Sequence, residues 1–394
     1  MRRLLVPLLL AACVEGEAGG WAGTVETLAN GAVRVSNPVQ GSWREGAGWR
    51  LVPELTLGSV DEGPQAFGFI VDIEVADDGR IFVLDRQSNA LHIFDADGTH
   101  LRTSGRSGQG PGEFVRANGM AWLPDGDSLL VVDAQGGRYH IFDSDGTYAR
   151  TVLRSLPGFP LAFEGAIFDD RVYERSSRRR DGAVEFVLIG TALGAGSPLT
   201  DTLSFPPQPA ALESFRFESN AGIMVMNVPF APVQAWQAVA DGSLWWGHGS
   251  DYRILRLSPA GDTLREIVSA AAALPVTAED IAEWEQQPGT RSFLDMGGRI
   301  ERDRIPRQKP YFTELYIDPE ARLWVDVPTV DGITAFDVFD ADGRLLGRLS
   351  TGVRRLRWVK PLVRNGRLYV VAADELDVPN VHVLRIAPDP VDAT

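Results

Sequence analysis

One phrase occurs twice in close copies along the sequence, and this repeat limits the folds that the chain can adopt. Residues 79–102 read GRIFVLDRQSNALHIFDADGTHLR, and residues 126–150 read GDSLLVVDAQGGRYHIFDSDGTYAR. Each copy has a glycine turn, an alternating strand that ends in Asp, a polar loop, a second strand, an Asp-Gly turn and a third strand. Asp-Gly pairs favour tight hairpin turns. The repeat therefore indicates a small antiparallel sheet that is used several times, as in a β-propeller.

More diverged copies of the repeat continue along the chain. A Gly, or a residue in its place, opens the second strand of each unit, at Gly79, Gly126, Asp170, Gly242, Ala321 and Gly366. The successive spacings are 47, 44, 72, 79 and 45 residues, and a propeller blade takes roughly 40–50. The two long spacings predict insertions near residues 206–232 and 270–310. We expect an extra hairpin in the first and one short helix in the second, where Thr277 and Asp280 form a capping-box pattern.

The two ends of the repeat region complement each other. The sixth unit has only three predicted strands, whereas Trp49–Leu57 is a predicted strand without a unit. We expect this N-terminal strand to supply the missing outer strand, because closure of the ring removes free sheet edges. The predicted fold class is all-β: a six-bladed propeller of four-stranded antiparallel blades over residues 49–394, with one short inserted helix.

The repeat resembles a known family. The segments 79–85 (GRIFVLD), 93–98 (IFDADG) and 105–114 (GRSGQGPGEF) are similar to NHL-type repeats and, more narrowly, to bacterial six-bladed propeller lipoproteins. In such repeats the Asp that ends the second strand, here Asp85 and Asp133, usually ties down its own turn by hydrogen bonds. Function in that superfamily ranges from protein and RNA scaffolding to lactonases and lyases, so the fold alone does not choose among them.

The N-terminus has the pattern of an export signal. Two arginines precede an apolar run and then Ala11, Ala12 and Cys13, and roughly ten apolar residues are too few to cross a bilayer. The segment 10–13 (LAAC) resembles the lipobox of bacterial lipoproteins, in which Cys13 would carry lipid. We predict a signal peptide over residues 1–12 and a lipidated tether over 13–48, with a strand near residues 24–35. Since Val14 rather than Asp follows the cysteine, we predict an outer-membrane location. A plain secretory signal is the alternative.

Charge limits the partners. The formal net charge is −15, whereas nucleic-acid binding needs a cationic surface. We therefore expect no nucleic-acid partner. We also expect no membrane contact beyond the lipid anchor, and we expect a monomer. The basic runs at residues 178–180 and 354–367 are interpreted as solvated loops or faces.

The sequence has no recognisable catalytic constellation. It has no Gly-x-Ser-x-Gly elbow and no credible Ser/His/Asp set. The histidines do not have zinc-site spacing; they are His92, His100, His140, His248 and His382. We predict no catalytic residue and no cofactor, although calcium, which needs only oxygen ligands, is compatible with so acidic a chain.

Three functions are compatible with these patterns. The favoured one is an envelope-anchored binding module for a protein, peptide or glycan, whose ligand meets polar loop residues at one mouth of the channel: Arg86, Asn89, Arg116, Asn118 and Arg138. The alternative is a metal-dependent lactonase or lyase acting at that mouth, with a calcium-type ion polarising the substrate. Its motif is Glu62-Gly63-Pro64, which resembles the opening of gluconolactonase-like propellers, where the Glu is a metal ligand. A purely structural envelope component is the third.

Overall fold

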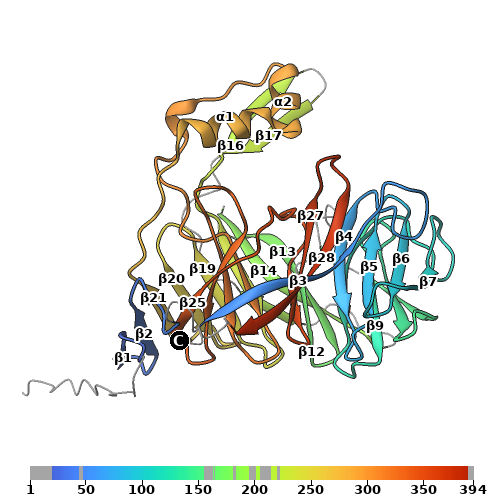
Figure 1. Cartoon of the computed structure of the whole chain (residues 1–394), viewed down its shortest axis with the longest axis horizontal. Coiled ribbons are helices and arrows are strands. Elements are labelled where there is room, and N and C mark those ends of the chain that lie inside the picture. Colours follow the sequence, from blue (N-terminus) through green and yellow to red (C-terminus); the bar gives the residue numbers. More distant parts are fainter. Residues whose placement is uncertain are drawn as a thin grey trace, which may run out of the picture.

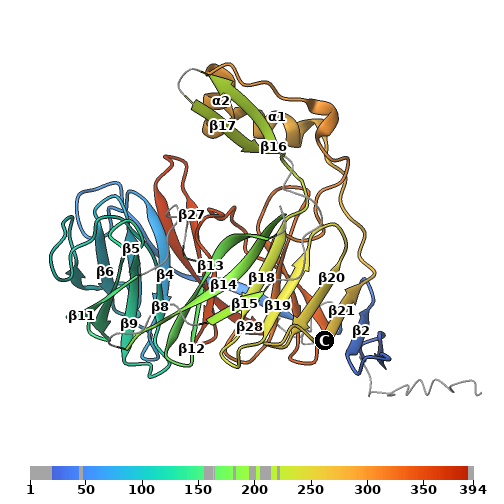
Figure 2. The same cartoon turned by 180° about the vertical axis from the view of Figure 1, so that it is seen from behind.

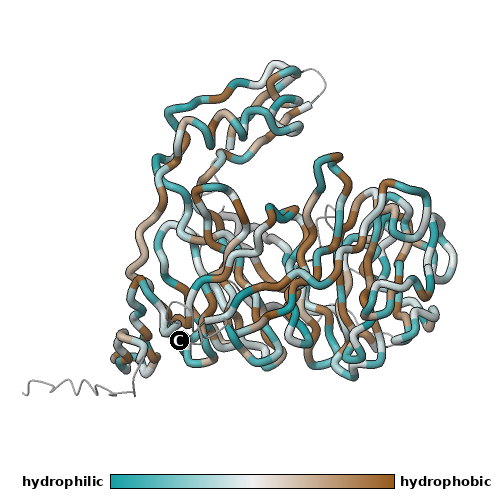
Figure 3. The backbone as a smooth tube through the Cα atoms, in the orientation of Figure 1, coloured by the Kyte–Doolittle hydropathy of each residue, from teal (hydrophilic) through white to brown (hydrophobic). Residues whose placement is uncertain are grey.

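In the computed structural model of the chain, six sheets built around four-stranded antiparallel units form the blades of a propeller. Figure 1 shows this ring from the side. The predicted all-β fold, a six-bladed propeller of four-stranded blades, is confirmed. The structure describes residues 20–43, 48–154, 163, 165–180, 183–194, 201–204, 214–219 and 222–388. Figure 3 shows hydrophobic stretches along the strands of blade one and hydrophilic residues in the loops that join them.

The blades follow one another in chain order. Blades one to three are β4 (Ile70–Val75), β5 (Ile81–Asp85), β6 (Ala90–Phe94) and β7 (His100–Ser104); β8 (Ala117–Trp122), β9 (Ser128–Asp133), β10 (Arg138–Asp143) and β11 (Tyr148–Leu153); and β12 (Gly165–Phe168), β13 (Arg171–Arg180), β14 (Ala183–Ala192) and β15 (Asp201–Ser204). Blades four to six are β18 (Gln234–Ala238), β19 (Leu244–His248), β20 (Arg253–Leu257) and β21 (Thr263–Ser269); β22 (Glu314–Ile317), β23 (Leu323–Val327), β24 (Ala335–Phe339) and β25 (Leu345–Ser350); and β26 (Leu362–Arg364), β27 (Arg367–Ala373) and β28 (Pro379–Pro388).

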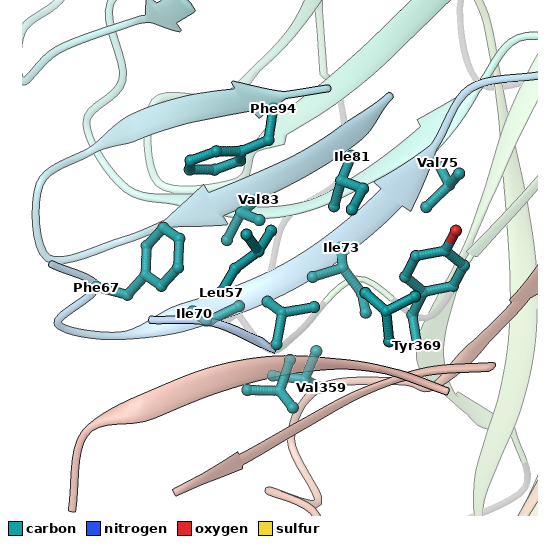
Figure 4. Packing of buried hydrophobic residues seen from close by; sticks show 13 residues of the cluster. Leu57, Phe67, Ile70, Ile73, Val75, Ile81, Val83, Phe94, Val359 and Tyr369 are labelled. Atoms are coloured by element: carbon teal, nitrogen blue, oxygen red, sulfur yellow. The ribbon is translucent and has the colours of Figure 1, made fainter. Parts of the chain in front are cut away.

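The N-terminal strand β3 (Trp49–Leu57) closes the ring as predicted. It pairs antiparallel with β28, from Val381 opposite Leu57 to Pro388 opposite Trp49, and forms the outer strand of blade six. Leu57 is fully buried in a cluster that joins blade six to blade one, beside residues such as Val83 and Ile70 (Figure 4). The alternating strand pattern and the missing sixth outer strand were therefore sufficient to predict the closure.

The predicted tether over residues 13–48 is wrong for most of its described part, whereas the strand expected near residues 24–35 is present, as two strands. Strands β1 (Thr24–Thr27) and β2 (Val33–Asn37) form a hairpin, and β2 pairs parallel with β21, which extends blade four to six strands (Figure 1). The buried Asn37 fixes this hairpin, because its Oδ1 accepts a hydrogen bond from the Leu345 backbone N–H of blade five at 2.7 Å. Cys13 and the predicted signal peptide lie outside the described residues.

The two insertions pack together into one unit, which we call the cap (residues 214–230 and 276–305). It contains the predicted hairpin, β16 (Ser214–Ser219) with β17 (Gly222–Asn227), and the helices α1 (Ala278–Gln286) and α2 (Pro288–Asp295), followed by a 3₁₀ turn, η1 (Arg302–Arg304). The expected capping box at Thr277 is present. The prediction of one helix is wrong, because Pro288 begins a second helix: proline cannot continue α1 but is favoured at a first helical position.

Both insertions enter from the same face of the ring. Each follows the outer strand of one blade and precedes the inner strand of the next. Strand direction alternates within a blade, so these connections emerge on the same side as the loops between second and third strands. Figures 1 and 2 show the cap standing on this side, which we call the capped face. The cap has its own small core, built around the buried Phe215 and Phe293 with Trp284 packed against them.

Candidate binding site at the capped mouth of the channel

The five residues predicted to meet a ligand lie on the capped face. Arg86 and Asn89 belong to the loop between β5 and β6, Arg116 and Asn118 lie at the start of β8, and Arg138 begins β10. They therefore occupy one sector of the rim, on blades one and two. Contact with a ligand stays a prediction for all five.

Three of the five are held by structural hydrogen bonds, namely the two asparagines and Arg138. Asn118 is buried, and its Oδ1 accepts from the Ala134 backbone N–H at 3.1 Å, so its side chain ties a loop of blade two and does not reach the surface of the rim. Asn89 adopts a positive φ of 50°, a conformation that Asn tolerates, and its Nδ2 donates to Ser107 Oγ at 3.0 Å. Arg86 and Arg116 are thus the stronger candidates.

The three arginines are half-buried cations. The Arg86 guanidinium lies over the Phe69 ring, 3.9 Å from the ring centroid. Burial, and then the nearby cation of Arg116, lower the pKa of Arg86. Arg138 donates from Nη1 to the Gln109 carbonyl oxygen at 2.6 Å, in the connection between blades one and two. This sector of the rim therefore concentrates positive charge on an acidic protein.

The aspartates that end the second strands are structural, as the repeat predicts. Asp85 accepts hydrogen bonds from the backbone N–H groups of Phe69 at 2.8 Å and Gln87 at 3.1 Å. In blade two, Asp133 accepts from Arg116 N at 2.8 Å and is fully buried. Both carboxylates fix the connection into their own blade, which positions the arginines of the rim.

A cavity of about 240 Å³ opens at the capped mouth of the channel. It is lined by the first residues of inner strands and by the connection into blade six, and a second cavity of about 180 Å³ continues from it deeper into the channel. Four side chains border both cavities: Asp72, Phe163, Tyr316 and Lys360. The two spaces therefore form one continuous depression along the channel axis.

Trp358 forms a fixed aromatic wall of this cavity. One face of its indole stacks on Phe69, with ring centroids 5.3 Å apart and planes inclined by 19°. Its Nε1 donates to the Ile70 carbonyl oxygen at 3.1 Å. The side chain nevertheless stays 47% exposed. Arg86, Phe69 and Trp358 are thus three stacked layers that connect the basic rim with the cavity.

A buried charge network holds the loop that carries Trp358. Arg355 donates from Nε and Nη2 to Asp326 Oδ2 at 2.9 and 2.8 Å, and it also pairs with Glu314. Its Nη1 donates to the Val359 carbonyl oxygen at 3.1 Å. Burial raises the pKa of Glu314, and the cation of Arg355 opposes this rise. The interpretation of residues 354–367 as a solvated basic run is therefore wrong for Arg355, which is buried.

Two channel carboxyl groups have a raised affinity for protons. Asp72 accepts from the Met120 backbone N–H at 2.6 Å, but burial raises the pKa of Asp72 to about 7, with this hydrogen bond and the cation of Lys360 opposing the rise. Glu74 follows on the same face of β4. Burial, and then the charge of Asp72, raise the pKa of Glu74 well above its usual value. The pair therefore carries at least one proton near neutral pH.

A larger groove of about 1190 Å³ lies between the N-terminal segment and blades four and five. Its lining includes seven glycines and alanines and the tryptophans Trp43 and Trp49, but only two charged residues, Asp337 and Arg348. Its charged residues pair with each other, since Arg348 Nε donates to Asp337 Oδ1 at 2.6 Å and Tyr252 donates to Asp337 Oδ2 at 2.7 Å. We therefore regard the capped mouth, where charged and aromatic side chains converge, as the candidate site.

Within the described residues, no group of three or more His, Cys, Asp or Glu side chains is arranged to hold a metal ion. Across the same residues, no helix is long and apolar enough to span a membrane. The loop that contains Glu62 lies exposed at the connection into blade one.

Comparisons with known proteins agree with the fold. A family model described as a six-bladed β-propeller, DUF5128, matches residues 65–160, which span blades one and two. No curated protein matches the chain significantly. The part matched by the family model is the part in which the repeat is clearest.

Solved structures of low sequence identity share the architecture. A member of the DUF4221 family from Bacteroides vulgatus aligns with a TM-score of 0.53 and 12% identity, over 87% of this chain and 100% of that one. A Bacteroides fragilis protein, named as a candidate for export, aligns with a TM-score of 0.50 and 10% identity, over 90% and 99% of the two chains. Virginiamycin B lyase from Staphylococcus aureus is more distant, with a TM-score of 0.42 and 11% identity over 86% and 100%. The first two similarities support the fold alone.

The sequence-based search for site residues missed the centre of the site. Trp358, Lys360 and the Arg355 network lie in the irregular connection into blade six, where no repeat position identifies them. One signal was available in the sequence. The basic run contains a tryptophan, Trp358, between cationic residues, and tryptophan and arginine are enriched at binding surfaces.

Proposed function

We propose that the protein is an envelope-anchored β-propeller that binds a protein, peptide or glycan at the capped mouth of its channel. The observation that carries the proposal is the cavity beside Trp358, an aromatic side chain that is fixed on one face and exposed on the other. Concave sites with aromatic walls and a few convergent polar groups are the usual form of binding sites. The rim arginines Arg86, Arg116 and Arg138 would extend the contact beyond the cavity.

The proposed site can be tested by photo-crosslinking in cells. A benzophenone amino acid replaces Val330, which is 83% exposed in the β23–β24 loop of the capped face. A matched control carries it at Ala260, an exposed residue between β20 and β21 on the opposite face. We expect an adduct from position 330 that disappears when Trp358→Ala is added, and none from position 260. Equal adducts at both positions, or an adduct that survives Trp358→Ala, would contradict the proposal.

The proposed anchor is the lipidated Cys13, which precedes the first described residue, Gly20, by seven positions. The support is the basic start, the short apolar run and the placement of the single cysteine of the chain. Cells that express the wild type should incorporate labelled palmitate into the protein, and Cys13→Ser should not. Label in the Cys13→Ser variant, or equal partition of both forms into the membrane fraction, would contradict the anchor.

Metal-dependent lactonase or lyase activity remains the alternative, and thermal unfolding tests it. Calcium at about one hundred times its dissociation constant would raise the free energy of unfolding by roughly 2.7 kcal/mol. We expect the same midpoint in excess EDTA and in millimolar calcium. A clear rise with calcium would favour the alternative over a binding module without metal.

A further inference from the structure

We infer that the ligand of the capped mouth is an acidic glycan, one whose sugar rings carry carboxylate groups, with Lys360 as the anchor of the carboxylate. This inference rests on the proposed function and specifies its ligand. It depends on the size of the cavity, on the open face of Trp358, and on the balance of charge around Lys360.

The cavity has the size of one substituted ring. An apolar cavity of about 150 Å³ holds benzene, so about 240 Å³ holds a single six-membered ring with its polar substituents. The open face of Trp358 offers a flat apolar surface to such a ring. Its other face and its Nε1 are already engaged by Phe69 and Ile70, so the indole is fixed before a ligand arrives, which lowers the entropic cost of binding.

The polar lining suits hydroxyl groups. Sugar hydroxyls both donate and accept hydrogen bonds, and the cavity presents both kinds of partner through Thr313, Asp72 and the cation of Arg357. Peptides are recognised mainly by addition of a strand to an open edge, or by extended or helical segments in long grooves. The capped mouth is instead a ring-sized depression that ends in the channel. Its shape therefore favours a glycan over a peptide.

Lys360 is one of three cations that line the cavity, with Arg175 and Arg357. Among the described residues it has no hydrogen-bond or ion-pair partner; its Nζ lies 5.6 Å from the Trp236 ring centroid and borders both cavities. The second lysine of the chain, Lys309, is by contrast paired with Asp280 at 2.6 Å. An ammonium group held over an aromatic ring in a depression is an effective anchor for a carboxylate.

The neighbouring carboxyl groups are either paired with other cations or partly protonated. Two arginines, Arg355 and the half-exposed Arg357, balance the two carboxyl groups of Asp326 and Glu314. Asp72 and Glu74 share the channel with Lys360 but hold at least one proton near neutral pH, because burial raises the pKa of each carboxyl group. The mouth is thus more positive than the protein as a whole, whose net charge is −15.

The test compares acidic glycans with their own neutral forms by titration calorimetry. The probes are tetra- to hexasaccharides of galacturonate, of mannuronate and of a glucuronate-containing polymer, each with a counterpart in which the carboxyl groups are reduced to alcohols. A charge-assisted hydrogen bond changes affinity by about tenfold or more. We expect at least one acidic probe to bind about tenfold or more tightly than its reduced form, and Lys360→Met to remove this difference. Lys360→Arg, which keeps the charge, should retain it.

The two lysines provide an internal control. After reductive methylation with ¹³C-formaldehyde, the NMR signal of Lys360 should shift when the acidic probe is added, whereas the signal of Lys309 should not. Equal binding of acidic and reduced probes, binding unchanged by Lys360→Met, or no binding of any probe would each overturn the inference. In each of these cases a crosslink that depends on Trp358 would still support the proposed function. Failure of the acidic-glycan inference can therefore be distinguished from failure of the proposed binding function.

Discussion

Removal of the Arg355 side chain should destabilise the ring by breaking a buried charge network. Arg355 is buried, with its side chain 1% exposed, and it joins Glu314 of β22 and Asp326 of β23 to the Val359 carbonyl in the connection into blade six. The guanidinium is therefore the shared counterion of two carboxyl groups and a link between two blades. Arg355→Met fills similar space but supplies neither the charge nor the donors.

The expected loss follows from the environment of the two carboxyl groups. Removal of one partner of a buried ion pair costs about 3–5 kcal/mol, because it leaves an uncompensated charge in a poorly solvated place. We expect Arg355→Met to lower the free energy of unfolding by about that amount, measured by urea unfolding followed by tryptophan fluorescence. The loss should be larger at pH 8 than at pH 5. Burial already raises the pKa of Glu314 and the Arg355 cation opposes this rise, so without Arg355 the folded-state pKa of Glu314 rises further and its protonation at low pH relieves part of the penalty.

A triple variant separates the charge effect from loss of packing. Arg355→Met combined with Glu314→Gln and Asp326→Asn keeps the shapes but contains no buried charge. If uncompensated charge is the cause, the triple variant should be clearly more stable than Arg355→Met alone. Equal stability of the two variants, or a loss under about 1 kcal/mol in the single variant, would refute this reasoning.

Three further outcomes follow from the structure. Burial raises the pKa of Asp72 to about 7 against about 3.9 in the unfolded chain, so the wild type loses stability as pH rises between these values. Asp72→Asn loses one of the two backbone hydrogen bonds that the carboxylate accepts, from Ile73 and Met120, at every pH, so its thermal midpoint relative to the wild type should be higher at pH 8 than at pH 5, and a difference independent of pH would contradict this. Leu57→Ala in the closing strand, where the side chain is fully buried, should cost about 2–5 kcal/mol in urea unfolding, and a negligible loss would mean that β3 does not hold the ring closed. Glu283 of α1 pairs with the exposed Arg354 of the ring, so Glu283→Gln should change overall stability by under about 1 kcal/mol yet increase hydrogen exchange in the cap but not in blade one; unchanged exchange in the cap would argue against this contact as a cap–ring link.

The parts of the fold that were predictable are those with local signals. The Asp-Gly turns and alternating strands identified the blades, and the surplus strand ending at Leu57 identified the closure. The hairpin of residues 24–37 has weak alternation and gains its order from a partner some 230 residues later in the chain, opposite Arg265 to Ser269. A local pattern contains no information about such a parallel pairing, so the segment was taken for a tether.

The same reasoning explains why the site was only partly predictable. The rim arginines stand at repeat positions and could be named from the loops between strands. Arg355, Trp358 and Lys360 lie in an irregular connection, and their positions follow from contacts with other blades. A run of basic residues gives no sign that one member is buried while a neighbour borders a cavity, because that distinction depends on tertiary packing.

The departure of blade five from the repeat supports a functional role for the mouth. The turn before the second strand is at Gly79 in blade one and at Ala321 in blade five. Five residues after it, blade one has the buried Leu84, whereas blade five has Asp326. The residues that pair with them across the inner strands are Asp72 and Glu314. An aliphatic residue at position 326 would be compatible with the fold, as blade one demonstrates, and a buried ion network offers no stability beyond such packing. Proteins depart from the usual preferences of sequence for structure, such as apolar residues at buried strand positions, most often at binding and catalytic sites. The network around Arg355 is therefore better explained by the loop it fixes, which carries Trp358 and Lys360 into the mouth, than by the stability of the ring.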